Sequence, residues 1–279
     1  MSGDESLRSA ALFGRDHVDI GAVASVSEGG AGIAISRGGA SKTYSYVEPN
    51  EDAAAFAEGA GGLVVVVADG HYGCQGSEAA VHVLLERWVP SWTAETPPTD
   101  DADGWQDVVI DALLEVNHEI LRSASLREMP PAPTTLSLAI VRPGENRLVA
   151  ACVGDSHLFV VRQGTADDRG WASTGRERTH FLGREEESRT SLLERSVLQV
   201  TNLSDAPAVV LVTDGISEEG IGLAEPGEAV AQAVAGASAY ASDRRSLECS
   251  KGVVAAALGA HRRQRAGDNV AVAVVLSGV

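Results

Sequence analysis

The chain has 279 residues, of which 44% are hydrophobic and 22% charged, a composition typical of soluble globular proteins. Its 39 acidic and 22 basic side chains give a formal net charge of −17. This charge argues against nucleic acid and against an anionic membrane surface as partners, because both bind basic patches.

The N-terminal region shows no basic segment followed by an apolar stretch, so we expect no signal peptide. No apolar run approaches the length of a membrane span. The three cysteines, Cys74, Cys152 and Cys249, are widely spaced and odd in number. They fit reduced thiols better than a disulfide framework or a zinc site, and we expect a cytoplasmic protein.

The first part of the chain predicts short strands and one long buried strand. Residues 1–18 carry little periodicity and suggest a loose leader, and residues 20–36 predict short strands broken by glycines. An acidic turn at residues 46–53 then precedes a connector rich in alanine and glycine. The apolar run at residues 63–68 is typical of a strand that is buried on both faces.

The remaining elements do not alternate one helix per strand, which disfavours a doubly wound parallel sheet. Packed sheets flanked by pairs of helices, an α+β arrangement, fit the order better. We expect one domain over residues 1–279, because no linker and no repeat divides it. The patterns predict helices at 77–89, 105–125, 228–240 and 247–265, strands at 136–141, 148–153, 157–162, 208–213 and 270–276, and a polar, flap-like excursion at 163–195.

Four of the apolar strands carry an aspartate at one end. A single Asp-Gly is more typical of a hairpin turn, but the recurrence favours a functional role. If these ends converge, the carboxylates raise each other's pKa, and a hard divalent cation with oxygen ligands relieves the repulsion. The aspartates are Asp69, Asp155, Asp214 and Asp268.

Six short motifs together resemble the signature blocks of the type 2C metal-dependent Ser/Thr protein phosphatases, over roughly residues 20–279. The resemblance implies a central β-sandwich of two mostly antiparallel sheets flanked by α-helices, in four layers (α-β-β-α). The motifs are Asn50-Glu51-Asp52, Asp69-Gly70-His71-Tyr72-Gly73, Thr134-Thr135, Val153-Gly154-Asp155-Ser156, Thr213-Asp214-Gly215 and Gly267-Asp268-Asn269.

The resemblance also implies a metal site that holds two Mn²⁺ or Mg²⁺ ions. In the family pattern one carboxylate bridges the ions and the next residue offers its backbone carbonyl; these positions match Asp69 and Gly70. Asp155 matches the ligand of a third, weaker metal site. The remaining ligands of the pair match Glu51, Asp214 and Asp268.

Two further positions match catalytic groups of the family. Asp52 matches a carboxylate that holds metal-bound water, and His71 lies where the family places a general acid for the leaving alkoxide. An alternative for His71 is a turn histidine hydrogen-bonded to a neighbouring carboxylate. In such a site two metals lower the pKa of a bridging water, and the resulting hydroxide attacks phosphorus directly. Ser156 is therefore not expected to be a nucleophile.

One position departs from the family pattern. Five residues before Asp52 the family commonly has an arginine that grips the substrate phosphate, and this chain has Val47. Valine cannot replace a bidentate guanidinium contact, so either another cation substitutes or phosphate binding is weak. The candidate cations are Lys42, Arg37, Arg176 and Arg178.

Three functions stay open at this point. The first is a bacterial-type phosphatase, expected to be a monomer, that hydrolyses phosphoserine and phosphothreonine in a phosphorylated protein substrate. The second, suggested by Val47, is a catalytically silent relative that binds phosphoproteins or other partners. The third is a hydrolase of small phosphate esters whose phosphate-binding group suits another substrate.

Overall fold

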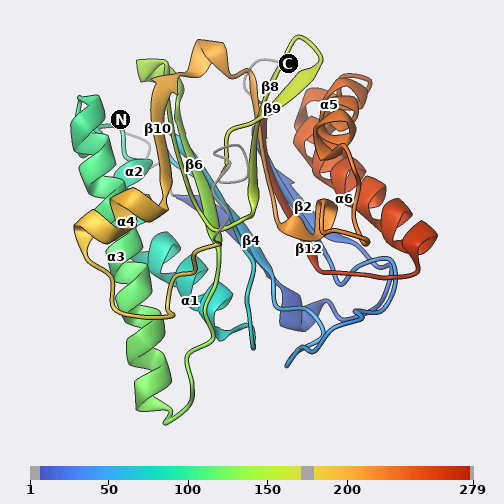
Figure 1. Cartoon of the computed structure of the whole chain (residues 1–279). Helices are drawn as coiled ribbons and strands as arrows, with labels where there is room; N and C mark the ends of the chain where they lie inside the picture. The colour runs from blue at the N-terminus through green and yellow to red at the C-terminus, as the bar shows by residue number, and fades with distance from the viewer. Residues whose placement is uncertain (1–6, 171–178, 277–279) are drawn as a thin grey trace.

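The computed structural model describes residues 7–170 and 179–276. Two antiparallel sheets of six strands pack face to face, and helices cover both outer faces (Figure 1). This arrangement confirms the α+β sandwich that the sequence predicts. Among the described residues, no helix is both long enough and apolar enough to cross a membrane.

The first sheet combines the N-terminal strand with the long hairpin in the middle of the chain. Its spatial order is β1-β4-β5-β6-β7-β10, and every neighbouring pair is antiparallel. The strands are β1 (Arg8–Phe13), β4 (Ala53–Glu58), β5 (Leu63–Ala68), β6 (Leu136–Arg142), β7 (Arg147–Val153) and β10 (Val197–Asn202).

The second sheet places the last strand of the chain at its centre. Its order is β2-β3-β12-β11-β8-β9, again with antiparallel neighbours throughout. The strands are β2 (Ala24–Glu28), β3 (Ala31–Ser36), β8 (His157–Arg162), β9 (Thr165–Asp168), β11 (Ala208–Val212) and β12 (Val270–Leu276).

The helices form two separate outer layers (Figure 1). Over the first sheet lie α1 (Gln75–Val83), α2 (Val89–Trp92), α3 (Ala102–Leu126) and α4 (Arg189–Arg195), and over the second lie α5 (Pro226–Ala237) and α6 (Arg245–Gln264). A π-helical turn, η2 (Leu84–Trp88), joins α1 to α2. Short 3-10 turns are η1 (Gly14–Asp16), η3 (Pro143–Glu145), η5 (Leu203–Asp205), η6 (Asp214–Ile216) and η7 (Ser242–Arg244).

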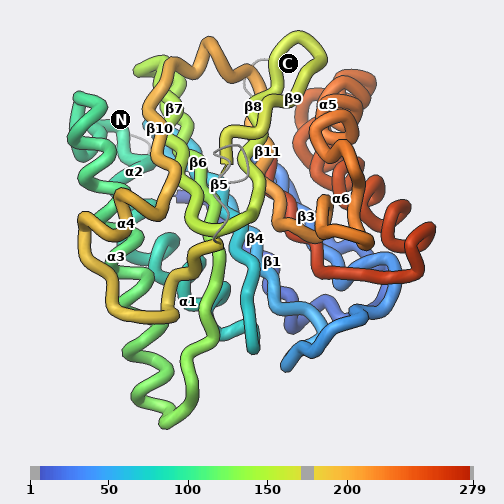
Figure 2. Tube along the Cα trace, in the orientation of Figure 1, coloured from blue at the N-terminus to red at the C-terminus, as the bar shows by residue number. Residues whose placement is uncertain are grey.

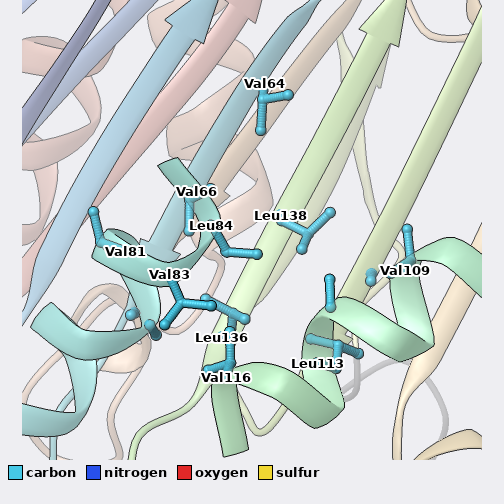
Figure 3. Packing of buried hydrophobic residues seen from close by; sticks show 14 of the residues in the cluster. Val64, Val66, Val81, Val83, Leu84, Val109, Leu113, Val116, Leu136 and Leu138 are labelled. Carbon is cyan, nitrogen blue, oxygen red and sulfur yellow. The ribbon is translucent and has the colours of Figure 1, made fainter. Parts of the chain in front are cut away.

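The strand β5 shows why its sequence is apolar without interruption. Val64 and Val66 pack on the helices, together with Leu138 of β6 and Leu113 of α3 (Figure 3). The alternate residues of β5 belong to the core between the two sheets. Both faces of this strand are therefore buried, as the sequence predicts, because successive side chains of a strand point to opposite faces.

Two segments that looked irregular in the sequence are strands. Residues 8–13, expected to belong to a loose leader, form the edge strand β1, and the expected connector contains β4. The two strands pair from Arg8 with Glu58 to Phe13 with Ala53. Both are rich in alanine, which has low strand propensity, so only their pairing with each other and with β5 reveals them.

The polar excursion at residues 163–195 also contains regular structure. It includes β9, which pairs with β8, and the helix α4, while residues 171–178 lie outside the described residues. The strand β10, which follows it and pairs with β7, was not predicted. These elements lie at sheet edges or on the outer layer, where mixed polar sequences hide the periodicity.

Candidate metal centre

The ends of strands from both sheets meet at one end of the sandwich. Asp69 follows β5, Asp155 lies in the turn between β7 and β8, and Asp214 opens η6 directly after β11. One carboxylate oxygen from each lies within 4.8 Å of those from the other two. This spacing allows the three side chains to ligate the same ion or neighbouring ions.

The cluster opens into a cavity of about 270 Å³. The segment 40–50, in blue, borders this end of the sandwich beside the red segment that leads into β12 (Figure 2), where Gly267 N donates to Ser41 O at 3.0 Å. The cavity is lined by Lys42, Tyr44, Ser45, Glu51, Asp69, Gly70, His71, Tyr72, Asp214, Glu218 and Asp268.

Asp52 is buried beneath this cavity, directly before β4. Its Oδ2 accepts a hydrogen bond from Thr213 Oγ1 at 2.8 Å, while its Oδ1 is buried without a hydrogen-bond partner among the described residues. Asp155 has the same arrangement, because Thr179 Oγ1 donates to Oδ2 at 2.9 Å and Oδ1 has no partner in the described part of the chain. Each carboxylate thus keeps one oxygen available for a cation or water.

Glu51 and Asp268 also line the cavity, and both lie near Lys42. The Lys42 Nζ atom is 3.9 Å from Glu51 Oε2 and 3.5 Å from Asp268 Oδ1. The other oxygen of Glu51 accepts the backbone N–H groups of Val47 and Glu48, both at 3.2 Å. Asp268 Oδ1 also accepts the hydroxyl of Tyr44.

Burial and mutual repulsion raise the pKa values of the carboxylic acids in this cluster. Burial, together with the negative charge of Asp268, raises the pKa of Asp52 to about 7. Burial and the neighbouring carboxylates also raise the pKa values of Asp69 and Asp214 well above the usual range. The partnerless oxygens and the all-oxygen donor set fit hard divalent cations, which would remove this repulsion.

Gly70 lies where a side chain cannot fit. A Cβ atom at this position would lie 2.5 Å from Glu51 O and 3.0 Å from Ser77 Oγ. The Gly70 backbone N–H donates to Glu51 O at 3.2 Å, which ties the Asp69 turn to the segment that carries Glu51. The expected role of its carbonyl as a metal ligand stays a prediction.

His71 lies at the mouth of the site, and 36% of its side chain is exposed. Its ring makes an edge contact with Phe181, at 4.6 Å between centroids. Its Nδ1 is 3.9 Å from Asp69 Oδ1, which is longer than a hydrogen bond. Burial lowers the pKa of His71, although the charge of Asp155 opposes this. The general-acid role stays a prediction.

A hydrogen-bonded chain outside the cavity connects two of the acidic segments. Asp168 Oδ2 lies 2.7 Å from His157 Nδ1, and His157 Nε2 lies 2.5 Å from Ser217 Oγ. His157 begins β8 two residues after Asp155, and Ser217 N donates to Asp214 O at 2.7 Å. These hydrogen bonds therefore join the turn that carries Asp214 to the strand that follows Asp155.

Of the two described cations considered as phosphate-binding groups, Lys42 lines the cavity and Arg37 does not. Val47, at the position of the family arginine, is 64% exposed and does not line it. Arg37 is used elsewhere, because its Nη1 donates to Val18 O at 2.9 Å. Arg176 and Arg178 lie outside the described residues.

Three residues of the cavity wall, Tyr44, Ser45 and Glu218, were not predicted from the sequence. Tyr44 reaches Asp268 from a loop, and no sequence pattern links two residues so far apart. Glu218 could have been found from its spacing, because it is an acidic residue only four positions after Asp214. In the structure its backbone N–H donates to Asp214 O at 2.7 Å. Burial and the charge of Asp268 raise the pKa of Glu218, as expected for a member of the same acidic cluster.

Comparison with known families agrees with this geometry. A sequence profile described as Protein phosphatase 2C matches residues 39–250, more than half of the chain. The chain belongs to the protein phosphatase 2C family. A separate search of curated proteins found no match.

Solved structures of protein phosphatases share the sandwich. A bacterial serine phosphatase has a TM-score of 0.63 and 16% identity, with 90% of this chain and 99% of that chain covered. The serine/threonine phosphatase PstP/Ppp of Mycobacterium tuberculosis has a TM-score of 0.59 and 17% identity, with 97% of this chain and 99% of that chain covered. The catalytic domain of PstP in complex with two manganese ions has a TM-score of 0.59 and 18% identity, with 96% of each chain covered. At these identities the likeness concerns the fold.

Proposed function

We propose that this chain is a metal-dependent phosphatase that hydrolyses phosphoserine and phosphothreonine in proteins. The observation that carries the proposal is the convergence of Asp69, Asp155 and Asp214 within 4.8 Å, in a member of the protein phosphatase 2C family. The PstP catalytic domain, which has the same fold, is known in complex with two manganese ions. We therefore infer that Mn²⁺ or Mg²⁺ is the cofactor here.

Within this proposal each acidic residue has a role in binding metal. Asp69, Asp214 and Asp268, together with Glu51 and the Gly70 carbonyl, hold the two cations, and Asp155 serves a third. When bound, the pair of cations lowers the pKa of water and neutralises charge on the phosphoryl oxygens. The raised pKa values of Asp69 and Asp214 support their assignment as ligands, because crowded carboxylates repel one another until cations bind.

Two side chains would handle protons and water. Asp52 Oδ1, buried and without a partner among the described residues, is placed to accept a hydrogen bond from a water molecule. His71 is partly exposed at the mouth of the site, where a leaving seryl or threonyl oxygen would depart. Because such an oxygen is strongly basic, a donor N–H at that point assists its departure.

The test is phosphate release from p-nitrophenyl phosphate and from a phosphothreonine peptide, with Mn²⁺, with Mg²⁺ and with EDTA. We expect turnover that needs a divalent metal, and we expect Asp69→Ala and Asp214→Ala to lower it by a factor of about 10³ or more. Both variants should stay folded by circular dichroism. Wild-type rates in both variants would refute the site assignment.

The position of Val47 favours one second candidate, a silent module that binds phosphoproteins without hydrolysis. The position at which the family commonly has a phosphate-gripping arginine holds valine here, and this valine does not line the cavity. Absence of turnover with every divalent metal, together with retained binding of a phosphothreonine peptide, would favour this candidate. A faster rate on small phosphate esters than on peptides would instead indicate a metabolite phosphatase.

A further inference from the structure

The side chain of Lys42 is enclosed in the wall of the cavity. Only 5% of this side chain is exposed, although Lys42 lies in a loop without helix or strand. Its ammonium lies 5.2 Å from the ring centre of Tyr44 and 5.6 Å from that of Tyr46. Two aromatic faces at this distance attract a cation, so the ammonium is held at the edge of the acidic cluster.

The donors of Lys42 are not saturated by the acids beside it. The distances of 3.5 Å to Asp268 Oδ1 and 3.9 Å to Glu51 Oε2 are ion-pair distances, longer than the roughly 2.7–3.2 Å of an N–H···O hydrogen bond. An ammonium carries three N–H donors on a flexible stem. It can therefore turn donors toward an anion in the cavity without losing its attraction to either carboxylate.

An anion entering this cavity meets strong repulsion. Five carboxylates line the wall, those of Glu51, Asp69, Asp214, Glu218 and Asp268, and the chain as a whole has a net charge of −17. Among the described lining residues, Lys42 is the one lysine or arginine. A phosphate dianion needs positive charge close to its oxygens, and a buried cation supplies it more strongly than an exposed one.

We propose that Lys42 is the phosphate-binding cation of this site, which contacts the phosphoryl oxygens of the substrate and makes the cavity selective for phosphomonoester dianions. The inference rests on the proposed function, because it assigns a substrate contact in the same site. It differs from a purely structural role, in which Lys42 only neutralises Glu51 and Asp268. A counter-ion of that kind would affect metal affinity and folding but not the binding of phosphate.

The chain offers a matched control, because it contains only two lysines, Lys42 and Lys251. Lys251 lies on α6, pairs with Glu248 at 3.4 Å and is 43% exposed. The experiment titrates inorganic phosphate by calorimetry into wild type, K42M, K42R and K251M, each saturated with Mg²⁺. Steady-state kinetics with p-nitrophenyl phosphate and thermal melts accompany the titration for each protein.

We expect K42M to weaken phosphate binding about 10-fold or more and to raise KM similarly, with a smaller change in kcat. K42R should retain most of the affinity, and K251M should match wild type. Mg²⁺ should bind K42M as tightly as wild type or more tightly, because a competing cation has left Glu51 and Asp268.

Unchanged phosphate affinity in metal-loaded K42M, or no phosphate binding by wild type, would overturn the inference. These results are distinguishable from failure of the proposed function. A wild type without turnover would refute the phosphatase, and the phosphate titration would still decide the role of Lys42. Turnover by wild type with equal phosphate affinity in K42M would leave the phosphatase standing and reduce Lys42 to a counter-ion.

Discussion

The carboxyl group of Asp52 illustrates how single residues hold the acidic site in place. Its side chain is buried, and its Oδ2 accepts a hydrogen bond from Thr213 Oγ1 at 2.8 Å. Thr213 Oγ1 also accepts the backbone N–H of Ala271 at 2.9 Å. One hydroxyl therefore stabilises a buried charge and joins the end of β11 to β12.

Replacing Thr213 by valine keeps the shape and removes both hydrogen bonds. We expect T213V to raise the pKa of Asp52 further and to lower the free energy of unfolding by about 1–3 kcal/mol. Thermal unfolding in EDTA at pH 7.5 measures this, with T201V as the control, because Thr201 is exposed on the edge strand β10. Equal melting temperatures of T213V and T201V would contradict the role of Thr213.

Which residues the sequence predicts depends on where they lie. The aspartates at strand ends could be found because a charged residue directly after an apolar run is visible in the sequence. Lys42 was named as a candidate cation, but its enclosure by Tyr44 and Tyr46 depends on the path of a loop. No local pattern encodes that path, so the contact of Tyr44 with Asp268 could not be predicted.

At the scale of elements, the edge strand β1 positions the acidic segment before β4. The chain leaves β1 through η1, where Gly14 N donates to Asp52 O at 2.8 Å. A Cβ atom on Gly14 would lie 2.5 Å from Asn50 Oδ1 and 2.6 Å from Asn50 O. The backbone of the turn at residues 50–52 is therefore fitted closely against the end of β1.

The variant G14A tests this contact. We expect the added methyl group to displace residues 50–52, to lower stability by about 1–3 kcal/mol and to weaken Mn²⁺ binding, because Glu51 and Asp52 move. Calorimetric titration of Mn²⁺ and thermal melts measure the two effects. G144A is the matched control, since a Cβ there meets no atom within 4 Å. Wild-type metal affinity in G14A would show that β1 does not support the site.

Most elements were predictable, and the exceptions share one cause. The strands of the two sheet centres are long and β-branched, and the helices α3 and α6 have continuous apolar faces, so periodicity identified them. The strands β1, β4 and β10 are short, rich in alanine or partly polar. Their state is decided by pairing with distant strands, which a local pattern does not contain.

At the scale of the whole molecule, the acidic centre costs stability until cations bind. A carboxylate whose pKa is higher in the folded state keeps its proton there at pH values where the unfolded chain has lost it. The folded state then binds more protons, so stability falls as pH rises through the range between the two pKa values. For Asp52 this range extends from about 4 in the unfolded chain to about 7 in the folded one.

We predict that, as the pH rises from about 4 to about 7, the melting temperature of the metal-free wild type falls relative to that of D69N. The comparison with D69N is needed because burial lowers the pKa values of His71 and His261, which makes stability rise with pH below about 6.5. Mn²⁺ at about 100 times its dissociation constant should raise the wild-type melting temperature by roughly 5–10 °C. Equal pH profiles for wild type and D69N would contradict the raised pKa of Asp69.

The central claim is that the carboxylates at this end of the sandwich hold a pair of divalent ions. Anomalous X-ray diffraction from crystals grown with Mn²⁺ tests it most directly, because the manganese positions are then observed independently of any assay. We predict two peaks about 3.5–4 Å apart in the cavity, beside the carboxylates of Asp69, Asp214 and Asp268. Manganese bound only at the surface, with none beside Asp69 at a saturating concentration, would contradict the account.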